Sequence, residues 1–121
     1  MKTMLVVDDS AFMRSLVKKS IVDLDISVIG EAGDGKEAYE KYVELNPDIV
    51  TLDLAMIEHN GIDALKNIML HDPKAKVIVI SSTTNQPNVV EEVMALGART
   101  VINKPNIKDA LINAVKEIDN E

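Results

Sequence analysis

The feature that most limits the possible folds of this chain is a regular alternation of short apolar runs with amphipathic segments. Each apolar run has the length of a strand, and the runs cover residues 4–7, 26–32, 49–52, 77–80 and 100–103. After each run, apolar residues return at the spacing of a helix face, as Leu16, Val17 and Ile21 do after the first. Strands that alternate with helices in this way form a parallel sheet with helices on both faces. The pattern predicts an α/β fold, a single doubly wound sheet of five parallel strands with five helices.

Residues that favour turns and helix ends separate these units. Gly33 follows the second run, and Asn46 with Pro47 is expected to end the second helix. Gly97 stands at the position expected for the C-terminal cap of the fourth helix. The apolar face predicted for the first helix includes Phe12, and that predicted for the fourth helix includes Met94. Residues 81–88 are predicted to form a polar loop.

The composition excludes several classes of protein. The 121 residues suit one compact domain, and the 46% of hydrophobic residues is enough for a real core. The chain has no cysteine, so neither disulfides nor thiolate metal sites are possible. No apolar run approaches the roughly 20 residues of a membrane span, and Met1 and Lys2 lead directly into the first strand. We therefore expect a cytoplasmic protein without membrane insertion, and the net charge of −7 argues against nucleic acid as its main partner.

Polar side chains that can carry chemistry follow four of the five predicted strands. In chain order they are Asp8 and Asp9, then Asp53, then Ser81 and Ser82, and finally Lys104. The second strand contributes only the turn that begins at Glu31. In doubly wound sheets the functional crevice lies beyond the carboxyl ends of the strands. If the first, third, fourth and fifth strands are neighbours, three carboxylates, a hydroxyl and an ammonium group meet in one pocket.

Such a pocket suits a hard cation and a phosphoryl group. Mg²⁺ binds through a few carboxylates while keeping several waters, and would neutralise the charge around Asp53. Lys104 and Ser81 could each contact one phosphoryl oxygen. Taken singly, each residue also has an ordinary structural interpretation, because aspartate and serine after a strand commonly cap a turn or the next helix.

The sequence resembles the receiver domain of two-component response regulators, most closely the single-domain chemotaxis type. The resemblance covers essentially residues 1–121, which we interpret as one receiver domain. Its motifs are Val6-Val7-Asp8-Asp9-Ser10, Asp48-Ile49-Val50-Thr51-Leu52-Asp53, Gly61, Val79-Ile80-Ser81, Gly97-Ala98 and Lys104-Pro105. It implies a flavodoxin-like, CheY-like sheet of order 2-1-3-4-5.

The resemblance also implies roles for individual residues. Asp53 would be the phosphorylation site, and Mg²⁺, for which Mn²⁺ can substitute, would be held by Asp8, Asp9, Asp53 and the backbone carbonyl of Ala55. Ser81 would be the switch hydroxyl, with Ser82 after it, and Lys104 would contact the phosphoryl group. The protein would not be an enzyme in the usual sense, although it would assist its own phosphorylation and dephosphorylation.

The partners implied are a histidine kinase as phosphodonor and a downstream protein, such as a flagellar motor switch protein or a phosphatase. The downstream protein would bind the face formed by the fourth helix, the fifth strand and the fifth helix. The protein itself would act as a monomer.

Several residues depart from the usual pattern of that family. Ile57 replaces the usual proline four residues after the phosphoacceptor, Ser82 replaces the usual alanine or glycine after the switch hydroxyl, and Asn106 replaces a frequent phenylalanine. Val101 occupies the position of an aromatic residue whose rotation reports phosphorylation. The site chemistry therefore looks intact, whereas the aromatic read-out is missing.

Competing functions are compatible with the same alternation of strands and helices. A flavodoxin needs a phosphate-binding loop after the first strand, where Asp8 and Asp9 would repel the FMN phosphate. A phosphatase with an aspartate nucleophile needs a second acid two residues later, where this chain has Ala55. A pseudo-receiver would bind partners without phosphorylation-dependent switching, and Val101 keeps that interpretation open. The chain could also be a receiver taken from a longer regulator such as the chemotaxis methylesterase.

Overall fold

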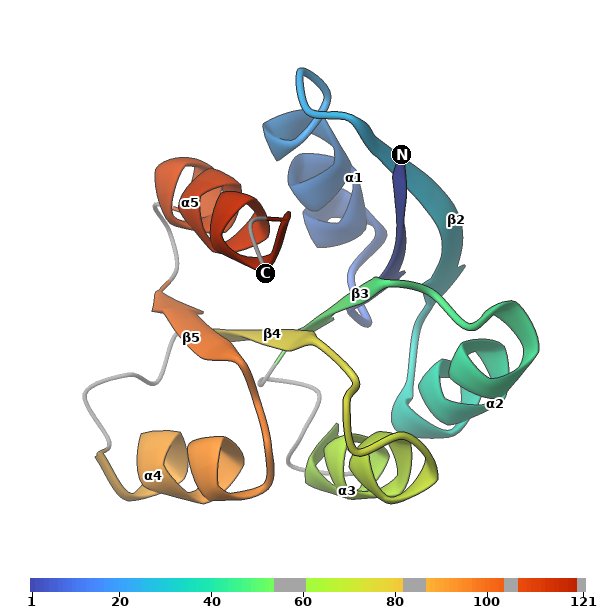
Figure 1. The fold of residues 1–121 in the computed structure, drawn as a ribbon, viewed down its shortest axis with the longest axis vertical. Helices are drawn as coiled ribbons and strands as arrows, with labels where there is room; N and C mark the ends of the chain where they lie inside the picture. The colour runs from blue at the N-terminus through green and yellow to red at the C-terminus, as the bar shows by residue number, and fades with distance from the viewer. Residues whose placement is uncertain (54–60, 82–86, 104–106, 120–121) are drawn as a thin grey trace.

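A five-stranded parallel sheet of order β2-β1-β3-β4-β5 forms the centre of the computed structural model (Figure 1). The structure describes residues 1–53, 61–81, 87–103 and 107–119. The strands are β1 (Lys2–Val7), β2 (Ile26–Ala32), β3 (Ile49–Asp53), β4 (Val77–Ser81) and β5 (Thr100–Asn103). The helices are α1 (Ala11–Ser20), α2 (Gly35–Leu45), α3 (Gly61–His71), α4 (Pro87–Ala95) and α5 (Ile107–Asp119). The predicted fold class and strand order are confirmed.

Helices cover both faces of the sheet. Figure 1 shows α1 and α5 on one face and α2, α3 and α4 on the other. Because successive strand residues point to opposite faces, each strand supplies both cores. Leu5 and Val7 of β1 pack toward α2, α3 and α4, whereas Met4 and Val6 pack toward α1 and α5. Burial on both faces explains why the central strands β3 and β4 are almost entirely apolar, whereas the edge strands β2 and β5 are only partly buried.

Some boundaries and exposures differ from the sequence-based expectations. The sequence predicts a loop over residues 81–88, but β4 extends to Ser81 and α4 already begins at Pro87. Phe12 and Met94 belong to the predicted apolar faces of their helices, yet Phe12 is 75% exposed and Met94 is 43% exposed. The fully buried part of α1 is shorter than expected, because its buried residues begin only at Val17.

The helix ends are defined by specific capping contacts. The Ser10 hydroxyl accepts a hydrogen bond from the Met13 N–H at the start of α1, and Asp34 caps α2 in the same way. At the end of α4, Gly97 has a φ of +114°, its N–H donates to Met94 and the next N–H donates to Val93. This pair of bonds is the Schellman motif, and its left-handed residue favours glycine. The predicted cap is confirmed.

No helix within the described ranges combines the length and the apolar character that crossing a membrane requires.

Candidate functional site

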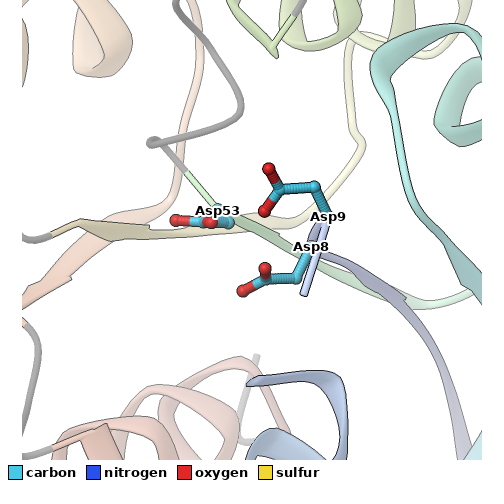
Figure 2. A group of neighbouring side chains, drawn as sticks. All are labelled: Asp8, Asp9 and Asp53. Carbon is cyan, nitrogen blue, oxygen red and sulfur yellow. The ribbon is translucent and has the colours of Figure 1, made fainter. Parts of the chain in front are cut away.

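Three aspartates from two neighbouring strands meet at the carboxyl edge of the sheet. Asp8 and Asp9 follow β1, Asp53 ends β3, and these two strands pair directly, with Val7 opposite Leu52. One carboxylate oxygen of each aspartate lies within 4.8 Å of the others. In Figure 2 the three side chains turn toward a common region. The expected convergence of these acids is therefore present.

The three acids differ in their surroundings. Asp8 and Asp53 are buried, with 3% and 2% of their surface exposed, whereas Asp9 is exposed. Carboxylates held this close repel one another, and a bound cation relieves that repulsion. Two buried acids beside an exposed one give a site that is anchored in the protein and open to solvent on one side.

Asp8 is held in place by its main chain and its side chain. Its N–H donates to the carbonyl of Ala32 at the end of β2, at 3.0 Å. Its Oδ1 accepts from the Ser10 N–H at 2.9 Å, and its carbonyl oxygen accepts from Arg14 Nη1 at 2.6 Å. Because Ser10 is also the N-cap of α1, the orientation of Asp8 is linked to the start of that helix.

Ser81 lies at the same edge of the sheet, on the strand next to β3. It is the last residue of β4 and is 1% exposed. Asp53 pairs with Ile80, so Ser81 lies one residue beyond the register of Asp53. β5 ends at Asn103, opposite Ser81. Lys104, Ser82 and Ala55, for which roles are predicted, lie outside the described residues, as do Ile57 and Asn106.

Val101 occupies the middle of β5, opposite Val79. Its side chain is half-buried and packs against the core cluster that lies between the sheet and α2, α3 and α4. Valine is stiff at χ1 because it is β-branched. The position for which the family resemblance implies an aromatic residue therefore holds a small side chain that contributes to the packing of the core.

Sequence reasoning missed two residues beside the site: Arg14, which contacts Asp8, and Glu31, which contacts Arg14. The sequence pattern places Arg14 among the polar residues of the first helix and Glu31 in a turn, and it assigns a role to neither. In the structure Arg14 Nε donates to Glu31 Oε1 at 3.0 Å, while Nη1 of the same guanidinium reaches Asp8. No local pattern indicates this contact, because Arg14 and Glu31 are 17 positions apart and meet only through the packing of α1 beside β2.

The fold and the site together define a class of protein. It is a flavodoxin-like α/β domain with an acidic site, suited to binding a cation, at the carboxyl edge of its sheet. The response regulator receiver domain family matches residues 4–116. The chain belongs to this family, which confirms the resemblance seen in the sequence.

Known relatives narrow the class further. The chain is 48% identical over 117 residues to the chemotaxis protein CheY of Thermotoga maritima, which covers 97% of each chain. The structure of the response regulator domain of Thermotoga maritima CheB matches with a TM-score of 0.90 at 38% identity, covering 100% of this chain and 98% of that one. A CheX–CheY–BeF3–Mg²⁺ complex from Borrelia burgdorferi matches with a TM-score of 0.88 at 35% identity, covering 97% and 88%. The chain is thus a CheY-like receiver domain, and such domains are signalling proteins of two-component systems rather than enzymes in the usual sense.

Proposed function

We propose that this protein is a response regulator that accepts a phosphoryl group on Asp53 with the help of Mg²⁺ and then changes its binding to a partner. The observation that carries the proposal is the meeting of Asp8, Asp9 and Asp53 at the carboxyl edge of the sheet. In this proposal residues 1–121 act as one cytoplasmic, monomeric receiver domain.

The donor set fits Mg²⁺ in both chemistry and spacing. Oxygens that bind one Mg²⁺ at about 2.1 Å lie at most about 4.2 Å apart. The oxygens of the three aspartates lie within 4.8 Å of one another, so small side-chain adjustments suffice. Ala55 would add its backbone carbonyl, and Mn²⁺ can substitute for Mg²⁺. When bound, the cation neutralises negative charge on the acids and on the incoming phosphoryl group.

Asp53 would act as the nucleophile. One of its carboxylate oxygens forms the new P–O bond while the P–N bond of a phosphohistidine breaks, and the donor imidazole leaves with the electron pair of that bond. The protein contributes position and electrostatic compensation: Asp53 ends a buried strand and is itself buried, so its direction of attack is set by the sheet. The same residues would assist hydrolysis of the acyl phosphate.

Ser81 and Lys104 would respond to the new group. A phosphoryl group adds a charge of about −1.5 to −2 and three strong acceptor oxygens. The Ser81 hydroxyl ends the strand next to β3 and would donate toward one of these oxygens. Lys104 follows β5 directly in the chain and would bind another, while Ser82 adjoins the switch position.

The proposed partners are a histidine kinase as phosphodonor and a downstream protein that binds the face of α4, β5 and α5. Chemotaxis is the favoured process because the Thermotoga maritima relative is a chemotaxis protein and covers nearly the whole chain. The Borrelia burgdorferi CheY was solved in complex with CheX, which supports a protein partner for this domain as well. A receiver within a longer regulator is the second candidate, favoured by the similarity to the response regulator domain of CheB.

Intact-mass spectrometry after incubation with acetyl phosphate tests the proposal. The unchanged protein should gain one phosphoryl group with Mg²⁺ and none with EDTA, and Asp53→Asn should gain none. Asp63→Asn, which removes an exposed acid from the first turn of α3, is the matched control and should react normally. Undiminished phosphorylation of Asp53→Asn, or of the chelated protein, would show that the proposal is wrong.

A further inference from the structure

We propose that Arg14 is a positioning residue that, anchored by Glu31, holds the peptide between Asp8 and Asp9 in the orientation that the cation site requires. This inference rests on the proposed function, because it concerns the same acidic site. The side chain of Arg14 is only 21% exposed. Its Nη1 donates to the carbonyl oxygen of Asp8 at 2.6 Å, and its Nε donates to Glu31 Oε1 at 3.0 Å.

The carbonyl of Asp8 belongs to the peptide unit that leads into Asp9. Because a peptide unit is planar, a donor that fixes its oxygen also fixes the direction in which the next residue leaves the chain. Asp8 itself is already held by Ala32 through its N–H and by Ser10 through its carboxylate. Arg14 therefore acts on the link between the buried acid and the exposed one, and so determines how Asp9 is presented to the cation.

Glu31 gives Arg14 a fixed anchor. The planar guanidinium presents its N–H groups in a rigid arrangement, so fixing Nε also directs Nη1. The other oxygen of Glu31 accepts from Lys18 Nζ at 2.9 Å, and its main-chain carbonyl accepts from the amine of Lys41. Glu31 immediately precedes Ala32, which accepts from Asp8. The end of β2 thus holds Asp8 twice, once through the backbone and once through Arg14.

An ordinary surface ion pair is the competing interpretation of the contact between Arg14 and Glu31. Such pairs have little effect on stability, and a contact between two side chains alone does not hold a peptide carbonyl. Lys18 offers a direct comparison, because it lies on the same helix, carries the same charge and binds the same carboxylate. Arg14 differs from it by a second contact, the hydrogen bond to the carbonyl of Asp8.

The experiment compares Arg14→Met with Lys18→Met by measuring Mn²⁺ affinity from the electron paramagnetic resonance signal of free Mn²⁺. Both variants lose one positive charge and one partner of Glu31. Arg14→Met should bind Mn²⁺ about tenfold more weakly, the lower end of the range for residues behind the metal ligands. Lys18→Met should show a clearly smaller loss, and Lys19→Met, which removes an exposed charge from the last turn of α1, should bind normally.

Two further measurements separate positioning from charge. Arg14→Lys keeps the charge but lacks the rigid guanidinium, so most of the loss should remain. In the metal-free protein, the ¹⁵N order parameter of the Asp9 amide should fall in Arg14→Met and stay unchanged in Lys19→Met. Where Arg14→Met fails to fold, Glu31→Gln should weaken Mn²⁺ binding in the same direction, because it removes the charged anchor.

Equal Mn²⁺ affinity in Arg14→Met and Lys18→Met, or full affinity in Arg14→Lys, would overturn the inference while leaving the proposed function in place. Unchanged affinity in Glu31→Gln would overturn it in the same way. Failure of the unchanged protein to bind Mn²⁺ would overturn the proposed function itself, and this inference with it.

Discussion

The phenolic hydroxyl of Tyr42 donates a hydrogen bond of 2.8 Å to Asp72 Oδ2, which joins α2 to the segment that follows α3. Tyr42 is among the largest fully buried side chains of the protein, and its ring meets the ring of His71 edge-on. Burial and the nearby Asp72 raise the pKa of the Tyr42 hydroxyl, and the hydrogen bond from Tyr42 lowers the pKa of Asp72. This contact lies toward the amino ends of the strands, away from the three acids, so it can be altered without touching the candidate site.

Tyr42→Phe should lower the free energy of unfolding by about 1 kcal/mol at neutral pH, the usual net contribution of one hydrogen bond. Because the folded pKa of Asp72 is lowered, the bond contributes above the ordinary carboxyl pKa and is lost as the pH falls through the folded value. The difference between the two proteins in urea unfolding should therefore shrink in acid. Tyr39→Phe is the control, because the Tyr39 ring also meets His71 edge-on. It should lower the free energy of unfolding by less than Tyr42→Phe does.

Asp48 should contribute to the acid sensitivity of the fold. Its Oδ2 accepts from the Thr3 N–H at 2.8 Å and from the Thr3 hydroxyl at 3.1 Å. The backbone N–H of Thr3 holds the pKa of Asp48 below its usual range, so the stabilisation is complete above the unfolded pKa of about 3.9 and is lost as the pH falls through the folded value. Asp48→Asn should show a flatter loss of stability in acid than the unchanged protein. Thermal unfolding measured at a series of pH values tests this, with Asp23→Asn, which changes an exposed acid, as the control. If Asp48→Asn and the unchanged protein lose stability in parallel as the pH falls, the assignment is wrong.

Removing either acid after β1 should weaken cation binding, but unequally. Asp9→Ala should lower Mg²⁺ affinity more than Asp8→Ala, because in this family the second acid is the usual direct ligand. The loss for Asp9→Ala should exceed the roughly 10- to 100-fold seen when residues behind the ligands are changed. Asp8→Ala should also destabilise the metal-free fold, because Asp8 is buried and accepts from the Ser10 N–H. Calorimetric titration with Mg²⁺ measures the affinities, and a larger loss for Asp8→Ala would reverse the assigned roles.

Lys104 and Ser81 should serve the response more than the acceptance of phosphate. Lys104→Ala should still accept some phosphoryl group from acetyl phosphate yet lose most of the binding to its downstream partner. Ser81→Ala should behave similarly, because we expect the buried hydroxyl at the end of β4 to bind the new group rather than to transfer it. Normal partner affinity of phosphorylated Lys104→Ala, measured by calorimetry, would contradict this division of roles.

Val101 should make the response depend on displacement of the chain after β4 rather than on rotation of a ring. Valine is too small and stiff to alternate between exposed and buried positions as an aromatic ring does. On adding Mg²⁺ and beryllofluoride, a phosphoryl mimic, NMR shifts should be large from Ser81 through α4 and modest around Val101. Shifts confined to the three aspartates and their immediate neighbours would support a pseudo-receiver, in which phosphate is taken up without being transmitted.

The fold class is predictable from the sequence because it depends on local patterns. A strand buried on both faces must be apolar throughout, and an amphipathic helix must repeat its apolar residues at about 3.6 positions. Helix ends are local as well, and Gly97 is recognisable because the left-handed conformation after α4 favours a residue without a side chain. The strand order follows from the family motifs, since spacing alone leaves open which strands are neighbours.

Tertiary structure decided which of these residues meet. Asp8 and Asp53 are far apart in the chain, and only the pairing of β1 with β3 brings their carboxylates together. Arg14 reaches Asp8 and Glu31 because α1 packs beside the end of β2. The spacing of residues along the sequence does not predict this contact. Phe12 lies on the predicted apolar face of α1 yet is 75% exposed, because periodicity identifies an apolar face but does not show how far the rest of the protein covers it. Local backbone geometry is determined by short stretches of sequence, whereas the proximity of side chains depends on the packing of the whole chain.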